Sequence, residues 1–186
     1  MTTLDLPRPD VPPAIAVVRD FVNTTDHETG KDDVATGPAL MRYLLREGLL
    51  LPGSTRVTAE ELALAHRLRD GLRRALVLHE RGGNGQVPGL ADTLGELTVQ
   101  LDWSPAGPVL RASGAGVGSA LAQIGVAAHE AATSGLWKRL KICSWDECEW
   151  AYYDHSKNYS RSWCEYGCGN KVKTRAYRAR QKAGTS

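Results

Sequence analysis

The sequence has 186 residues, of which 42% are hydrophobic and 24% are charged, a composition typical of a globular protein. It contains no apolar run of membrane-spanning length and no apolar signal segment at its start, so we expect a cytoplasmic protein that makes no membrane contact. The net charge of +2 is unevenly placed, because residues 138–186 carry 11 Lys/Arg against 5 Asp/Glu, which leaves 12 against 16 in residues 1–137. Such a division indicates a polyanion-binding end joined to a different kind of domain.

The first part of the chain mixes clear and ambiguous patterns. Four prolines in residues 1–13 predict an extended N-terminal arm. Residues 14–22 are apolar and fit either a helix or a short strand, and residues 23–33 predict a polar loop. Residues 38–47 predict a helix, because Thr36 or Gly37 can cap its start and a glycine follows its end.

The middle of the chain predicts two longer helices and a hairpin. Thr58 and Glu61 form a capping box, and leucines at every fourth position then continue a helix to about residue 80. Residues 97–101 and 109–112 indicate a β-hairpin with a longer turn. Another helix is expected from about residue 117 to 134, with Gly135 as its C-cap. These patterns predict an α+β fold in which residues 14–137 form a mostly helical domain with a small antiparallel sheet.

All four cysteines lie within 26 residues near the end of the chain, as two close pairs with about 15 residues between them. This spacing is typical of a tetrahedral zinc site, in which each short loop brings two thiolates to the ion. Disulfides are disfavoured in a cytosolic protein, a C-x-x-C redox pair is absent, and the spacings of iron–sulfur proteins do not occur. We therefore predict one structural Zn²⁺ ion with four protein ligands: Cys143, Cys148, Cys164 and Cys168.

The size of this segment agrees with a metal site, since a unit of about 45 residues rarely has enough apolar core to fold unaided. Four thiolates complete the coordination of zinc and leave no position for a catalytic water. His155 lies between the cysteine pairs, but it has no second histidine at ligand spacing, and we expect His155 and Asp154 to be turn residues.

A basic segment follows the last cysteine and predicts a helix with cations on two faces and no carboxylate. A solvated helix usually mixes both signs, so an unmixed run indicates a phosphate-bearing partner. Arg161 can extend this basic surface, and nearby aromatic side chains either surround the metal or stack on bases. The expected nucleic-acid contacts are Arg161, Lys171, Lys173, Arg175, Arg178, Arg180 and Lys182.

No pattern in the sequence favours an enzyme. The histidines before residue 138 are scattered, and no nucleophile elbow, P-loop or dinucleotide fingerprint occurs. Asp20, Asn23 and Asp26 could line a pocket, although capping and turn roles are favoured for such residues. We expect no catalytic residues.

Residues 140–180, LKICSWDECEWAYYDHSKNYSRSWCEYGCGNKVKTRAYRAR, resemble the CGNR zinc finger, which is named for a cysteine followed by Gly-Asn-Arg. Here that stretch reads Cys168-Gly169-Asn170-Lys171, so lysine replaces the arginine, and the second cysteine pair is one residue closer than expected. Proteins with this finger commonly carry an N-terminal ABATE domain. The DFVNT stretch at residues 20–24 is similar to an early motif of that domain, and residues 35–51 are similar to its following helix.

The resemblance implies an ABATE-like domain at residues 14–137 and a treble-clef-like CGNR finger at residues 138–186. In such a finger Cys164 and Cys168 would lie at the start of the last helix. It also implies a stress-related transcription regulator whose finger binds double-stranded DNA and whose N-terminal domain senses a small-molecule or protein signal. An RNA-binding or protein-docking module is the alternative. Because a single finger binds weakly, a homodimer formed through the N-terminal domain is a further hypothesis.

Overall fold

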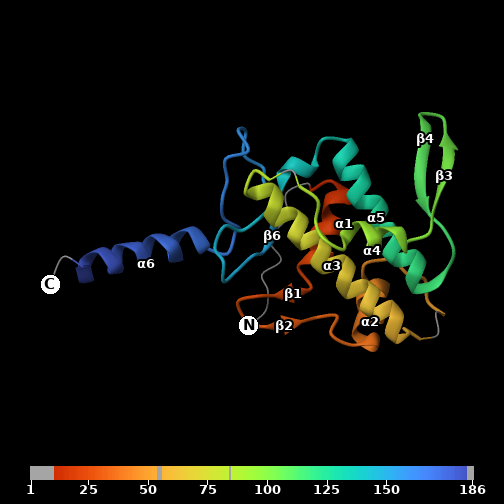
Figure 1. Ribbon diagram of the computed structural model, residues 1–186, viewed down its shortest axis with the longest axis horizontal. Coiled ribbons are helices and arrows are strands. Elements are labelled where there is room, and N and C mark those ends of the chain that lie inside the picture. The colour runs from red at the N-terminus through yellow and green to blue at the C-terminus, as the bar shows by residue number, and fades with distance from the viewer. Residues whose placement is uncertain (1–10, 54–55, 84, 184–186) are drawn as a thin grey trace.

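The computed structural model describes residues 11–53, 56–83 and 85–183. For residues 182 and 183 it describes the backbone alone. Most of the expected arm, residues 1–13, lies outside the described residues. Helices pack into a body from which two elements project at opposite ends, a β-hairpin at one end and a long helix at the other (Figure 1). The predicted α+β class and the two-part organisation of helical region and cysteine-rich finger are confirmed.

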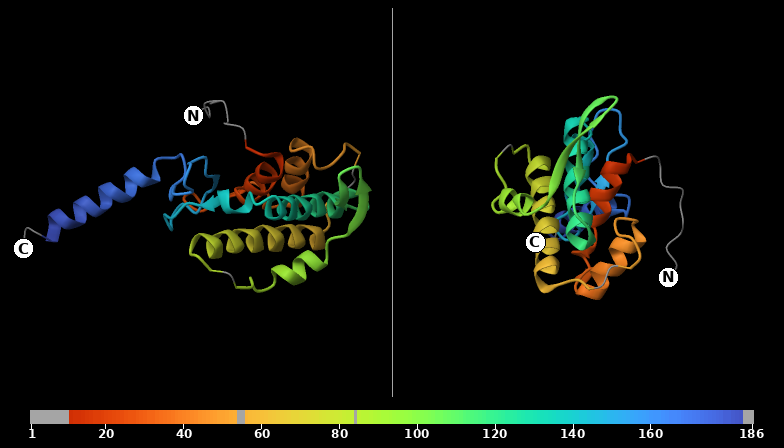
Figure 2. Two further views of the ribbon diagram at one scale, coloured as in Figure 1. Left: turned by 90° about the horizontal axis from the view of Figure 1, so that it is seen from above. Right: turned by 90° about the vertical axis from the view of Figure 1, so that its right-hand side faces the viewer.

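Residues 14–22, for which the pattern allowed a helix or a strand, form most of helix α1, Pro13–Val22. Proline suits the first helical turn, because its missing N–H has no partner there in any case. The buried side chains follow helical spacing, and α1 lies along α5, Gly116–Thr133 (Figure 2). They are Ile15, Val18, Phe21 and Val22.

Helices α2, Gly37–Arg46, and α3, Ala59–Glu80, confirm the predicted caps. The Thr36 side chain accepts a hydrogen bond from the backbone N–H of Ala39, and Thr58 and Glu61 make both bonds of the capping box. Gly135 follows α5 at a φ of 72°, which is the left-handed conformation expected of a glycine C-cap.

Three predictions about the connections were incomplete or wrong. The expected polar loop contains a small antiparallel hairpin, β1 (Thr25–Asp26) with β2 (Lys31–Asp32). Helix α4, Leu90–Gly95, was not predicted. The central hairpin pairs β3, Val99–Ser104, with β4, Gly107–Ala112, so its turn has two residues and is not a long one. Its strands extend into the stretch whose Trp, Ser, Pro and Gly residues had indicated a turn.

The finger begins with a 3-10 turn, Trp137–Arg139, followed by a two-stranded sheet of β5, Leu140–Ile142, and β6, Ala151–Tyr153. Leu140, Ile142 and Ala151 are buried in the same apolar core as α1, α3 and α5. The sheet of the finger therefore packs directly on the helical body. Helix α6, Cys168–Ala183, completes the chain. No described helix is long and apolar enough to cross a membrane.

Candidate metal centre and basic helix

The four cysteines occupy turns that lead into or out of regular structure. Cys143 follows β5, and its backbone N–H donates to the Trp150 carbonyl oxygen. Cys148 ends a tight turn in which its N–H donates to the Trp145 carbonyl oxygen. Cys168 is the first residue of α6, as the resemblance implied, but Cys164 lies four residues before the helix. The Cys143–Cys148 pair is thus held by a short backbone turn.

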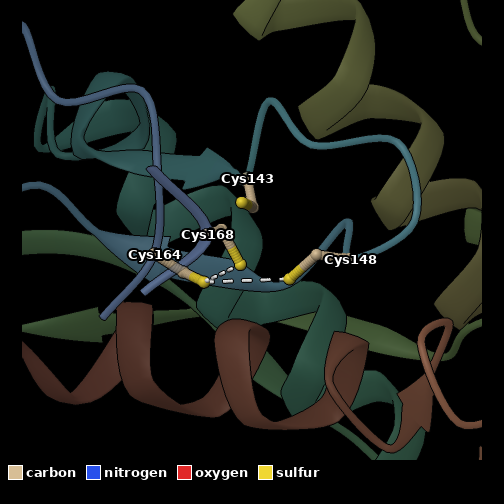
Figure 3. Close-up of side chains that lie close together, drawn as sticks. All are labelled: Cys143, Cys148, Cys164 and Cys168. Carbon is tan, nitrogen blue, oxygen red and sulfur yellow. Dashed lines mark hydrogen bonds between the residues drawn. The ribbon is translucent and has the colours of Figure 1, made fainter. Parts of the chain in front are cut away.

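The sulfur atoms converge on one point (Figure 3). All four lie within 4.8 Å of one another, with 3.7 Å between the sulfurs of Cys148 and Cys164 and 3.5 Å between those of Cys164 and Cys168. Four sulfurs at about 2.3 Å from a zinc ion would be about 3.8 Å apart in a regular tetrahedron. All four residues are buried and none forms a disulfide. The donor set and its dimensions fit one structural Zn²⁺ ion.

The acid–base chemistry of the thiols points the same way. Hydrogen bonds from the Cys148 and Cys164 thiols lower the pKa of Cys143 to about 2. The proton that Cys148 donates to Cys143 raises the pKa of Cys148 to about 12, and the pKa of Cys164 is raised for the same reason. Four thiolates at this distance would repel one another, and a bound cation offsets that repulsion.

The sequence allowed two roles for the nearby aromatic side chains, and four of these residues surround the cysteines. Trp145 and Tyr152 are buried in one cluster with the cysteines, and Trp150 and Trp163 pack against its edge. The Tyr152 hydroxyl donates to the Arg161 carbonyl oxygen at 2.6 Å. Tyr177 differs, since 58% of it is exposed on α6.

The loop between the cysteine pairs is organised by Asp154. This side chain is fully buried and accepts hydrogen bonds from the backbone N–H groups of Ser156 and Arg161, at 2.8 and 3.1 Å. Burial opposes its ionisation, but these bonds and the nearby Lys141 ammonium hold the pKa of Asp154 below its ordinary value. His155 is exposed, stacks edge-on against Tyr153, and is not part of the metal cluster.

Arg161 lies in this loop and not on the basic helix. Its guanidinium donates to the Trp163 carbonyl oxygen at 2.7 Å, approaches Glu165, and lies 5.2 Å from the centre of the Tyr152 ring. These contacts place its charge beside the metal shell.

The first two turns of α6 are tied to the rest of the molecule. The Lys171 ammonium is 2.6 Å from a Glu28 carboxylate oxygen, and Arg175 makes two hydrogen bonds to Glu147. Both cations also lie over the Trp145 ring, 4.7 and 5.3 Å from its centre. A shallow pocket is lined by these five residues together with Asn170, Thr174 and Arg178. The base of the helix is therefore basic but partly neutralised.

The outer half of α6 projects away from the body (Figures 1 and 2). Arg178 and Arg180 are exposed there, as is Lys173 nearer the base, and no carboxylate of the described residues pairs with any of the three. Arg178 shares a face with Lys171 and Arg175, whereas Lys173 and Arg180 lie on the opposite face. Lys182 belongs to α6, but its side chain lies outside the described residues.

Asn23 and Arg73 join the finger to the helical body. The Asn23 side chain and the backbone of Ala151 exchange two hydrogen bonds of 2.8 Å. Arg73, which is buried on α3, donates to the carbonyl oxygens of Val22, Thr25 and Glu149 at 2.6–3.0 Å. Asn23 falls in the DFVNT stretch, and that motif could have marked it as important. No sequence pattern marked Arg73.

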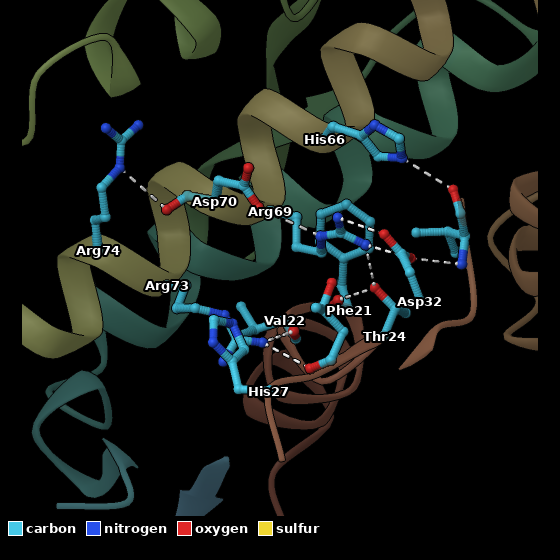
Figure 4. A network of polar contacts seen from close by, with 12 residues as sticks. Phe21, Val22, Thr24, His27, Asp32, His66, Arg69, Asp70, Arg73 and Arg74 are labelled. Carbon is cyan, nitrogen blue, oxygen red and sulfur yellow. Dashed lines mark hydrogen bonds and ion pairs between the residues drawn. The ribbon is translucent and has the colours of Figure 1, made fainter. Parts of the chain in front are cut away.

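A second buried arginine holds the β1–β2 hairpin on α3 (Figure 4). Arg69 makes two hydrogen bonds to the Asp32 carboxylate, at 2.7 and 2.9 Å, and a third to the Thr24 hydroxyl. Burial opposes ionisation of Asp32, yet Arg69 keeps the pKa of this carboxyl below its ordinary value. His66 Nε2 lies 2.9 Å from the Val34 carbonyl oxygen. These side chains are occupied in fastening the hairpin that carries Glu28, and Asp26 accepts turn hydrogen bonds within it.

Comparison with known families agrees with this two-part structure. Residues 139–181 match the CGNR zinc finger, and residues 16–135 match the ABATE family, described as "Putative stress-induced transcription regulator". A search of curated proteins finds no matching relative. The second match covers more than half of the 186 residues and contains most of α1 and all of α2 to α5, while the first contains the complete four-cysteine cluster. The chain therefore belongs to the ABATE family and carries a CGNR zinc finger with one structural zinc ion.

Proposed function

We propose that the chain is a transcription regulator that binds double-stranded DNA through α6, with the zinc finger holding this helix and the N-terminal domain adjusting its use. The observation that carries the proposal is a set of exposed cations along α6, Lys173, Arg178 and Arg180, that have no carboxylate partner among the described residues. Unpaired cations on one rod repel each other, and phosphates relieve that repulsion.

The shape of the helix supports duplex DNA as the partner. An α-helix with its side chains is about 10–12 Å wide, and the major groove of B-DNA is about 12 Å wide. Since α6 projects from the body, a groove can receive it without meeting the helical domain (Figure 2). Cations on opposite faces of such a helix would reach the phosphates of both strands.

The base of α6 supports a role for the N-terminal domain. Glu28 belongs to the turn of the β1–β2 hairpin. Its carboxylate pairs with the Lys171 ammonium at the position where a phosphate oxygen could bind. Arg69 and Asp32 fasten the same hairpin to α3. A signal that moved this hairpin would change how much of the basic face is available. We propose that this signal is a small molecule or a protein.

A salt titration of binding to random-sequence duplex DNA tests the proposal. With about five phosphate contacts, log K against log[salt] should fall with a slope of about −4.5. The variant Arg178→Ala/Arg180→Ala should weaken binding and reduce the slope by about 2. The matched control Arg42→Ala/Arg74→Ala removes two exposed arginines from α2 and α3 and should change neither quantity, although the net charge falls equally.

The same titration separates the alternatives. A flat salt response, or equal effects of the two double variants, would overturn phosphate binding by α6. Tighter binding to structured RNA than to duplex DNA at matched salt would replace DNA by RNA as the partner. Salt-insensitive binding to a protein would favour a docking module.

A further inference from the structure

The β3–β4 hairpin has one entirely apolar face. In the observed register Val99 pairs with Ala112, Leu101 with Leu110 and Trp103 with Pro108, and each directly opposed pair shares a face. The β3 half of this face is strongly exposed: Val99 by 43%, Leu101 by 73% and Trp103 by 77%. The face therefore presents large apolar side chains to water on an element that projects from the body (Figure 1).

The other face of the hairpin is mostly polar, with Gln100, Asp102 and Ser104 of β3 opposite Arg111, Val109 and Gly107 of β4. Arg111 donates to the Asp102 carboxylate at 2.8 Å, and the Ser104 hydroxyl donates to the Gly107 carbonyl oxygen. The hairpin is fastened to the body through β4, which lies beside α5. Leu101 and Trp103 remain largely exposed to water within the described part of one copy, so its core does not use them. Contiguous exposed apolar side chains of this kind mark an interaction surface.

We propose that this face is the contact through which two copies of the chain form a symmetric dimer. Its side chains change in size along the strand, from Val99 and Ala112 near the body to Trp103 and Pro108 near the turn, with Leu101 and Leu110 between them. A two-fold axis through Leu101 sets the large end of one copy against the small end of the other. The face is thus complementary to itself, as an isologous interface requires. It also lacks a charged group that would pair with a different, charged partner.

The area predicts how strong the dimer is. Given the 150–250 Å² that a large aromatic side chain can bury, the exposed apolar face offers on the order of 400 Å² per copy. A stable standard interface buries about 800 Å² per partner. An interface of about half the standard area should give a weak dimer whose population depends on concentration.

The position of the hairpin suits a nucleic-acid-binding chain but does not depend on that function. The hairpin and α6 lie at opposite ends of the molecule, so pairing through the hairpin leaves both copies of α6 uncovered (Figures 1 and 2). A dimer then carries two basic helices, and binding of the first raises the effective concentration of the second.

Sedimentation equilibrium of the full-length, zinc-loaded chain over a range of concentrations tests the proposal without any nucleic acid. The wild type should shift from monomer to dimer as concentration rises, and Leu101→Lys should raise the dissociation constant at least tenfold. Gln100→Lys adds the same charge one residue away on the opposite face and should dimerise as the wild type does. Because Leu101 is exposed, Leu101→Lys should keep the thermal unfolding midpoint and zinc content of the wild type.

A second variant, Trp103→Ser, guards against a local effect of the lysine and should also weaken the dimer. A wild type that stays monomeric at every concentration would overturn the proposal and leave the face to another partner. So would a dimer that Leu101→Lys and Trp103→Ser do not weaken. Failure of DNA binding by α6 would leave these outcomes unchanged, so the two proposals fail separately.

Discussion

The apolar core and the sulfur-centred cluster are built on different principles. The core gathers buried aliphatic side chains from α1, α2, α3 and α5, with β5 and β6 at its edge. The sulfur-centred cluster consists of the four cysteines with Trp145 and Tyr152. The first is large enough to be stabilised by burial of apolar surface. The second is small, and its sulfurs hold together as thiolates only around a cation.

The stability of the two regions therefore has different origins, and the sheet of the finger links them. Strands β5 and β6 belong to both, because Leu140 and Ile142 enter the core while Tyr152 faces the cysteines. The core can therefore hold the sheet of the finger in place, but it cannot hold the loops that carry Cys148 and Cys164. Metal is expected to order those loops and the base of α6.

Removal of zinc should have the largest effect, and it should unfold the sulfur-centred cluster but not the apolar core. Metal binding in small zinc fingers contributes about 10–16 kcal/mol, so a chelator or Cys164→Ser should unfold the loops around the metal and release α6. Helices α1, α3 and α5 should keep their structure because their core contains no metal ligand. Segment-resolved hydrogen exchange measures both responses.

The control for this experiment is Ser144→Ala, which alters an exposed side chain beside Cys143 and should leave exchange unchanged. Added zinc should restore protection after chelation but not in Cys164→Ser. Simultaneous loss of protection in α1, α3 and α5 would show that the two regions are one cooperative unit.

The cysteine site could be predicted because its information is local. Two close pairs at suitable spacing bring four thiolates together whatever the rest of the chain does. The capping box before α3 and the glycine after α5 are equally local, and the structure confirms both. Strands β1 and β2 and the short helix α4 were not predicted, because elements of two and six residues are too short to show a periodic pattern.

Long-range contacts explain the rest of what the sequence did not reveal. Arg73 reaches the Glu149 carbonyl across 76 residues, and Asn23 reaches Ala151 across 128. The leucine pattern of α3 predicted one apolar face, but buried Arg69 and Arg73 lie on that helix as well. An arginine in a helix is usually solvated, so only the tertiary structure shows which ones bind backbone carbonyl groups of other segments.

Arg73→Met should have the next largest effect, because it tests the connection between the two regions. The variant keeps the apolar stem but leaves the carbonyl oxygens of Val22, Thr25 and Glu149 without this donor. Hydrogen bonds to charged groups contribute about 1.5–3 kcal/mol each, and water will replace some of them, so we expect a net loss of about 3 kcal/mol. Calorimetry should show the finger melting before the core.

The neighbouring variant Arg74→Met is the matched control. Arg74 is exposed and its guanidinium contacts only the Asp70 carbonyl oxygen of its own helix among the described residues, so its melting curve should match that of the wild type. Equal destabilisation by the two variants would mean that Arg73 does not connect the regions. A single unshifted transition in Arg73→Met would mean the same.

Glu147→Gln should have the smallest effect. It tests the contact between the sulfur-centred cluster and the base of α6. Glu147 holds Arg175 over the Trp145 ring, and the Arg175 guanidinium lowers the pKa of Glu147, so the pair is charged at neutral pH. Because both partners are exposed to solvent, loss of this ion pair should barely change stability. If α6 binds phosphates, however, Arg175 no longer has to leave a carboxylate, and DNA affinity should rise about threefold.

The matched control Glu130→Gln removes an exposed carboxylate from α5 with the same change in net charge, and it should raise DNA affinity less. Equal gains in the two variants would reduce the effect to net charge, whereas a specific gain in Glu147→Gln would show that the metal-held loop competes with DNA for the base of α6.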